Sequence, residues 1–258
     1  MRNVAIALLL GALLLATTGS SHAARLPGCA RGAVDASAMY GYLLPGAYLL
    51  EEYAKALLSV RDHVAAASRI RDQRPIAAIV ADQPDSKTVQ LVFNFHEAIT
   101  LLHVYRDGRV DPDPEAAEAG PASIAMPSRC VLRLDYRKFH GLDYHYVGPS
   151  AERFISDVMF AGIYTDQTGT RWQIHNGLAI TPSQSFRYEF GIDLVGDALY
   201  WKNGLLLKDK DTQEAYEAYL GRGRKVEVFV YEANEDARMD PHRKRKRLWT
   251  LRRARGRE

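Results

Sequence analysis

Cysteine and long apolar runs are both scarce in this chain of 258 residues. Only Cys29 and Cys130 occur, so at most one disulfide can form within the chain. The longest apolar run, Val4–Ala16, has about thirteen residues, whereas a membrane-spanning helix needs about twenty. The sequence therefore predicts no transmembrane segment.

Catalytic motifs are also missing. No Gly-x-Ser-x-Gly elbow occurs, no glycine-rich loop joins a strand to a helix, and the acidic residues are too scattered to indicate a glycosidase pair. We therefore expect no cofactor and favour a non-catalytic protein. A hydrolase with a diffuse active site is kept as an alternative.

The first residues are typical of a secretory signal peptide. Arg2 precedes the apolar run Val4–Ala16, and the small residues Ser21 and Ala23 precede a cleavage position after Ala23 or Ala24. We expect residues 1–23 to be removed and residues 24–258 to form a single exported domain, in the periplasm or outside the cell.

Export would place both cysteines in an oxidising compartment. An even cysteine count there favours a disulfide between Cys29 and Cys130. The alternative is a lipoprotein cleavage box at Leu26–Cys29, but this tetrapeptide lies well beyond the apolar run and follows Arg25.

Positive charge is concentrated at the C-terminus. Residues 238–258 hold ten Lys or Arg and two Asp or Glu, although the whole chain has a net charge of only +3. This basic tail indicates contact with an anionic surface or, alternatively, a solvated end. The candidate anion contacts are Arg243, Lys244, Arg245, Lys246, Arg247, Arg252, Arg253, Arg255 and Arg257. In an exported protein we expect no nucleic-acid partner.

Short runs rich in β-branched and aromatic residues dominate the chain after Pro75. Asn-Gly and similar pairs between the runs favour tight hairpins. The predicted strands are 76–81, 88–95, 99–105, 131–137, 142–147, 154–164, 171–175, 178–182, 185–193, 197–201, 224–231 and 246–252. Trp249 should be at least partly buried in the last of these, as part of a closing strand.

Two helices and one loop complete the predicted fold. Apolar residues at three- and four-residue steps predict a helix over 49–64, in which Glu51 can pair with Lys55. A capping-box pattern at Asp211 and a glycine at Gly221 predict a second, short capping helix. The mixture of proline, alanine, glycine and acidic residues in 111–128 predicts a flexible loop. The fold class is therefore mainly β, an antiparallel meander in a barrel or strongly bent sheet, with an N-terminal helix and a capping helix.

A histidine-glutamate pair lies between two predicted strands. His96 and Glu97 are followed by His103, whereas a zincin helix would carry its second histidine three residues after the glutamate. We expect no metal at this position, and a hairpin turn is favoured over general acid-base catalysis. A second polar and aromatic cluster holds Tyr136, His140, Tyr144 and Tyr146. These residues suit either a binding surface or a half-buried strand.

Two classes of function follow from these features. The first is an exported binding protein that holds a small apolar or amphipathic ligand inside the bent sheet. The second is an exported protein-interaction factor, such as an inhibitor or immunity protein, that uses its aromatic surface and basic tail. The ligand-binding hypothesis is favoured.

Overall fold

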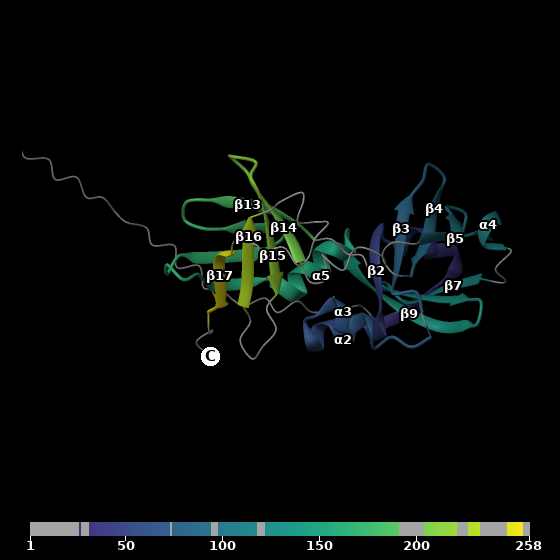
Figure 1. The fold of residues 1–258 in the computed structure, drawn as a ribbon. Helices are drawn as coiled ribbons and strands as arrows, with labels where there is room; N and C mark the ends of the chain where they lie inside the picture. The colour runs from purple at the N-terminus through teal and green to yellow at the C-terminus, as the bar shows by residue number, and fades with distance from the viewer. Residues whose placement is uncertain are drawn as a thin grey trace, which may run out of the picture.

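The structure, a computed structural model, describes residues 26, 31–72, 74–93, 98–117, 122–190, 204–220, 227–232 and 247–254. These residues form two antiparallel β-sheets with one helix, α5 (Ala151–Phe160), between them (Figure 1). The predicted mainly-β fold class is confirmed, because one sheet is a closed barrel and the other is strongly bent.

The first sheet has nine strands. In spatial order they are β1 (Arg31–Val34), β7 (Ala122–Ser128), β8 (Val131–Tyr136), β9 (Phe139–Gly148), β2 (Gly46–Leu50), β3 (Ala77–Asp82), β4 (Ser86–Val92), β5 (Ala98–Tyr105) and β6 (Val110–Pro112).

The second sheet is an eight-stranded barrel whose spatial order follows the chain. Its strands are β10 (Gly162–Thr165), β11 (Arg171–His175), β12 (Leu178–Ile180), β13 (Ser185–Phe190), β14 (Gly204–Asp209), β15 (Ala215–Leu220), β16 (Glu227–Glu232) and β17 (Arg247–Arg253). The other helices are η1 (Ala36–Ala38), α1 (Met39–Tyr42), α2 (Glu51–Val60), α3 (His63–Ala67) and α4 (Pro114–Ala117).

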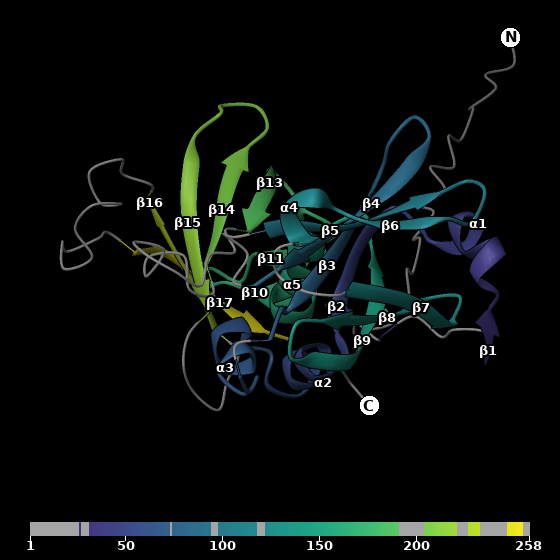
Figure 2. The ribbon, with the colours of Figure 1, turned by 90° about the vertical axis from the view of Figure 1, so that its right-hand side faces the viewer.

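The nine-stranded sheet curls so that its two edges approach each other (Figure 2). β5 and β7 lie near opposite edges in the strand order, yet they contact each other. The Lys87 ammonium group donates to the carbonyl oxygens of Tyr40 at 2.8 Å and Leu43 at 2.5 Å, which ties the end of α1 to β4. The curl gives this sheet a concave face.

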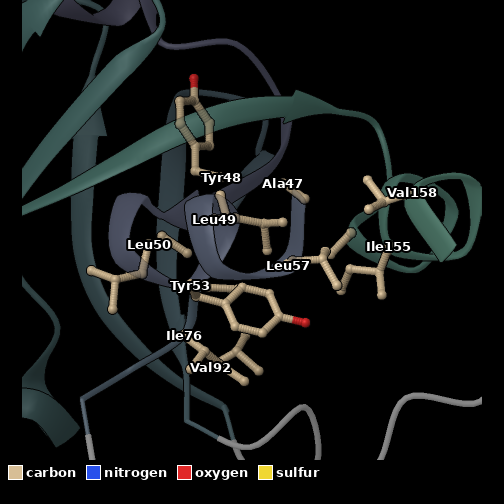
Figure 3. Packing of buried hydrophobic residues seen from close by; sticks show 14 of the residues in the cluster. Ala47, Tyr48, Leu49, Leu50, Tyr53, Leu57, Ile76, Val92, Ile155 and Val158 are labelled. Carbon is tan, nitrogen blue, oxygen red and sulfur yellow. The ribbon is translucent and has the colours of Figure 1, made fainter. Parts of the chain in front are cut away.

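Helix α5 packs against both sheets. Leu49 of β2, Leu57 of α2 and Ile155 of α5 are fully buried in one apolar group, from which the Tyr48 side chain points away (Figure 3). On the barrel side, Asp157 accepts hydrogen bonds from the Tyr188 hydroxyl at 2.6 Å and the Asn176 backbone N–H at 3.0 Å. The two sheets therefore share one continuous core.

The predicted N-terminal helix begins later than expected. Ala47 to Leu50 are all buried and form β2, which pairs on one side with β3 and on the other with β9. Helix α2 starts only at Glu51, and the expected Glu51–Lys55 ion pair is present. Arg61 adopts a left-handed conformation that ends α2, and α3 follows.

Two predicted elements have the opposite secondary structure. The predicted strand 154–164 is mainly helix α5, which Ser150 caps by accepting from the Arg153 N–H. The predicted capping helix after Asp211 is instead a hairpin turn and strand β15, because Asp209 accepts the N–H groups of Asp211 and Thr212. Gly221 lies outside the described residues.

The predicted loop 111–128 is largely regular structure. It contains the end of β6, helix α4 and all of strand β7, which joins β1 to β8. The high alanine and proline content suggested a loop, but pairing on both sides of β7 outweighs its weak strand propensity. The predicted strand 197–201 lies outside the described residues.

Candidate functional site

One end of the concave face brings together aromatic residues from distant strands. Tyr136 ends β8 and Phe93 follows β4, and three strands separate β8 from β4 in the sheet. Their ring centroids are nevertheless 6.3 Å apart in an edge-to-face contact. The curl of the sheet is what brings these two side chains together, and we call this region the Tyr136 end.

The Tyr136 hydroxyl is buried without a partner. Alternation along β8 places Tyr136 on the same face as the buried Leu132 and Leu134, and its side chain is only 1% exposed. The hydroxyl makes no hydrogen bond within the part of the chain that the structure describes. A buried polar group without a partner costs about 1–3 kcal/mol. Such a group needs an explanation, and an added hydrogen-bonding molecule would provide one.

The β8–β9 turn adds positive charge beside these rings. The guanidinium carbon of Arg137 lies 5.0 Å from the Tyr136 ring centroid, and the Lys138 ammonium lies 5.3 Å from the Phe139 ring centroid. Both cations are exposed. Asp135 accepts from the Gly141 N–H at 2.6 Å and from the Ser123 hydroxyl at 2.7 Å, and these bonds lower the pKa of its carboxyl group.

The other residues of the predicted aromatic surface do not join Tyr136 in one site. Tyr144 is fully buried, and its hydroxyl donates to the Pro75 carbonyl at 3.0 Å. Tyr146 donates to the Pro45 carbonyl at 3.3 Å and packs against Tyr48. The His140 side chain is 76% exposed, 3.8 Å from Asp135. Tyr144 and Tyr146 therefore have local structural partners.

The histidine-glutamate motif is only partly described. His96 and Glu97 lie outside the described residues, so the expected hairpin turn and the absence of a metal there remain predictions. His103 lies on β5, and its Nε2 atom is 2.9 Å from Asp113 Oδ2. Within the described ranges, no group of three or more potential metal ligands is arranged to hold an ion.

Three of the candidate anion contacts are described, all in β17. Arg247 and Arg252 are exposed, and Arg247 lies over the Phe229 ring at 4.8 Å. Arg253 is half-buried, and its guanidinium donates to the Ala161 carbonyl. Arg243, Lys244, Arg245, Lys246, Arg255 and Arg257 lie outside the described residues.

The barrel contains four aromatic residues in mutual contact, which we call the aromatic quartet. The sequence analysis singled out only one of them, Trp249. Trp172, Phe186, Tyr216 and Trp249 contact one another in a closed circuit, with centroid separations of 5.4–5.7 Å. Trp172 donates to Asp166 at 3.0 Å and Tyr216 donates to Glu214 at 2.6 Å. The prediction that Trp249 is partly buried in a closing strand is confirmed. The alternating apolar positions of β11 and β13 were the available signal for Trp172 and Phe186.

Because these rings pack against one another and the polar groups of Trp172 and Tyr216 have protein partners, the quartet is best explained as barrel core. The Tyr136 end, where a buried hydroxyl has no such partner, is the stronger candidate for a binding site.

Cys130 lies in the turn between β7 and β8, and the described part of the chain contains no free cysteine. Cys29 lies outside the described residues, so its bridge to Cys130 remains a prediction.

The chain matches no protein-family model, no curated protein and no solved structure. Across the described ranges, the helices are too short or too polar to cross a membrane.

Proposed function

We propose that the protein is an exported, non-catalytic binding protein that holds a small amphipathic ligand at the Tyr136 end of the curled sheet. The observation that carries this proposal is the buried Tyr136 hydroxyl without a hydrogen-bond partner. A ligand carbonyl, ether or hydroxyl group at this position would satisfy it.

The surroundings of Tyr136 support the amphipathic character of the ligand. The rings of Phe93 and Phe139 and the buried Leu134 offer apolar contact to a hydrocarbon or ring. Arg137 and Lys138, exposed beside them, favour an anionic head group. Binding sites of this kind combine a mostly apolar lining with a few polar groups that fix orientation.

The test compares two tyrosine variants. Protein purified from its native compartment should release a stoichiometric small molecule on solvent extraction, which mass spectrometry identifies. Tyr136→Phe should bind the molecule about five- to twelvefold more weakly and so retain less of it, because the variant lacks one hydrogen bond to the ligand, worth about 1–1.5 kcal/mol. Tyr144→Phe is the matched control, because its hydroxyl donates to Pro75 and should not touch the ligand.

The two tyrosine variants should differ in the opposite way in stability, where the control is the more strongly affected. In ligand-free protein, Tyr136→Phe should leave the free energy of unfolding unchanged or raise it, whereas Tyr144→Phe should lower it by about 1 kcal/mol. The proposal fails if both variants retain the wild-type amount of ligand, or if no small molecule accompanies the wild-type protein.

Protein interaction is the second candidate function. Tyr42 and Leu44 are the exposed large hydrophobic residues of the described chain, at 37% and 41%, and Arg129 lies over the Tyr42 ring at 4.7 Å. Aromatic and arginine side chains are enriched at protein interfaces. A protein that co-purifies with the wild type but not with a Tyr42→Ser, Leu44→Ser variant would favour this function.

A further inference from the structure

The loop between α1 and β2 displays two large apolar side chains. Leu43 is fully buried, whereas its neighbours Tyr42 and Leu44 are 37% and 41% exposed. Pro45, the next residue, is exposed as well. Figure 2 shows α1, which precedes this loop, at the outer margin of the curled sheet. We call residues 42–45 the Tyr42 loop.

Two tyrosine hydroxyl groups hold the backbone of the Tyr42 loop. Tyr48 of β2 is fully buried, and its hydroxyl accepts from the Leu44 N–H at 3.0 Å and donates to the Leu44 carbonyl at 3.1 Å. The Tyr146 hydroxyl donates to the Pro45 carbonyl at 3.3 Å, and its ring packs against that of Tyr48 at a centroid distance of 5.1 Å. The side chains of Tyr42 and Leu44 are therefore displayed from a fixed backbone.

The two ends of the loop are fixed as well. At the start, the Lys87 ammonium group donates to the Leu43 carbonyl at 2.5 Å. At the end, Gly46 has a φ of 127°, and a Cβ atom built on it would lie 2.5 Å from the Gly148 carbonyl oxygen, so only glycine fits. A surface that is ordered before binding loses little conformational entropy when it meets a partner.

Arg129 adds a positive charge to the exposed part of the loop. Its guanidinium carbon lies 4.7 Å from the Tyr42 ring centroid, and Nη2 lies 3.5 Å from the Tyr42 hydroxyl. Arg129 is exposed and makes no ion pair with any residue that the structure describes. Asp35, the acidic residue that precedes the loop in the chain, instead accepts from the N–H and hydroxyl groups of Ser37. The loop thus combines apolar tips with an uncompensated cation.

This combination suits the boundary of a lipid layer better than the surface of a folded protein. A standard protein interface buries about 800 Å² on each partner around an apolar core. Tyr42 and Leu44, by contrast, are the two large apolar side chains that the described chain exposes. Tyrosine is enriched at the membrane–water boundary, leucine favours the hydrocarbon, and arginine near the surface attracts anionic lipids.

We propose that the Tyr42 loop attaches the protein to the surface of anionic lipid membranes. Leu44 and Tyr42 enter the layer at the level of the head groups, and Arg129 pairs with lipid phosphate. This attachment is separate from ligand binding at the Tyr136 end. It uses the residues that also carry the second candidate function, so a protein interface is the competing outcome of the test.

Co-sedimentation of the full chain with lipid vesicles tests the attachment. The wild type should bind phosphatidylglycerol vesicles more tightly than phosphatidylcholine vesicles. Tyr42→Ser, Leu44→Ser should weaken binding about tenfold, because the apolar contact is lost. Arg129→Gln should weaken binding to phosphatidylglycerol about fivefold and leave phosphatidylcholine unaffected. Arg69→Gln, at an exposed arginine without a side-chain contact in the described chain, should bind as the wild type does.

Added salt separates the loop from the basic tail. Contacts of exposed charges should fade at about 0.5 M salt, whereas the remaining binding should still depend on Tyr42 and Leu44. Leu44→Trp should bind at least as tightly as the wild type, since tryptophan favours the membrane boundary. Equal thermal midpoints of all variants check that they fold.

The proposal is overturned if the wild type does not bind phosphatidylglycerol vesicles, or if the double serine variant binds them as tightly as the wild type. In the first case, a purified protein partner that is lost in Tyr42→Ser, Leu44→Ser would assign the loop to a protein interface.

Discussion

His63 is a fully buried imidazole in the first turn of α3. Its Nδ1 atom lies 3.4 Å from the Tyr53 hydroxyl. Burial lowers the pKa of His63 from 6.5 to about 4, although the nearby Asp62 carboxylate opposes the change. The folded protein therefore holds a neutral imidazole at a pH where the unfolded chain has already taken up a proton.

This difference predicts a loss of stability in mild acid. Because the folded pKa is the lower one, the contribution of His63 is complete above pH 6.5 and is lost as the pH falls towards 4. At pH 5 the loss should be about 2 kcal/mol. Urea unfolding at pH 7.5 and pH 5 should show this extra loss in the wild type but not in His63→Gln.

His140→Gln provides the comparison, because the His140 side chain is 76% exposed. Its pH dependence should match that of the wild type. Equal pH dependence in the wild type and the His63 variant would show that His63 does not exclude the proton in the folded state.

The special position of Tyr136 was only partly predictable from the sequence. Tyr136 was identified as a candidate because it lies in an aromatic cluster, but its missing partner depends on contacts across three strands. The contact between Tyr136 and Phe93 could not be predicted, since the two residues belong to strands that only the curl of the sheet brings together. Sequence spacing carries information about local neighbours and little about such distant pairs.

At the level of elements, β17 closes the barrel by pairing with both β10 and β16. Trp249 of this strand belongs to the aromatic quartet, and Leu251, two residues later, is fully buried. The Gln167 side chain extends the closure, since its amide donates to the Leu248 carbonyl and accepts the Thr250 N–H, both at 2.8 Å.

Truncation and substitution should separate the roles of this C-terminal segment. Removing residues 255–258 should leave the thermal midpoint almost unchanged, because β17 and its contacts stay intact. A truncation that begins at Arg253 would instead remove an arginine that donates to the Ala161 carbonyl at the end of α5. Trp249→Ala should cost about 2–3 kcal/mol, since a partly buried ring is lost from the quartet.

Calorimetry of the two variants and the wild type checks both expectations. A large midpoint drop on removal of residues 255–258 would mean that these residues contribute to the fold. A negligible effect of Trp249→Ala would mean that the barrel does not need the ring.

Strands were predictable from sequence where one face is buried and alternation is clear, as in β8 and β11. The two segments whose secondary structure was predicted wrongly, 154–164 and the residues after Asp211, have a common cause of error. The apolar residues of 154–160 fit both a strand and a helix, and residues 211–220 fit a capped helix until pairing with β14 is known. Tertiary pairing, which sequence does not display, decided both.

The whole molecule offers a geometric reason for the predicted disulfide. Arg31 pairs with Ser128 in the antiparallel register of β1 and β7. Cys130 lies two residues after Ser128, in the turn that joins β7 to β8, at the end of β7 that pairs with the start of β1. The bridge would close a loop of about 100 residues and add about 4–5 kcal/mol in the chain-entropy model.

Peptide mapping without reduction should find one linked peptide pair containing Cys29 and Cys130. A Cys29→Ser, Cys130→Ser variant should unfold at lower denaturant concentration and with a steeper slope, because the unfolded chain without the bridge is less compact. Two free thiols in the exported protein, or a lipid attached to Cys29, would contradict the prediction.

The order of the strands along the chain has a consequence for a protein whose N-terminal part is synthesised first. All the strands of the nine-stranded sheet end at or before Gly148, so that sheet can assemble as soon as this part of the chain has been made. The barrel must wait for β17, the last strand of the described chain, to meet β10. Until then β10 and β16 have unpaired edges that can recruit other chains, so the protein escapes aggregation only once its last strand has been made and paired.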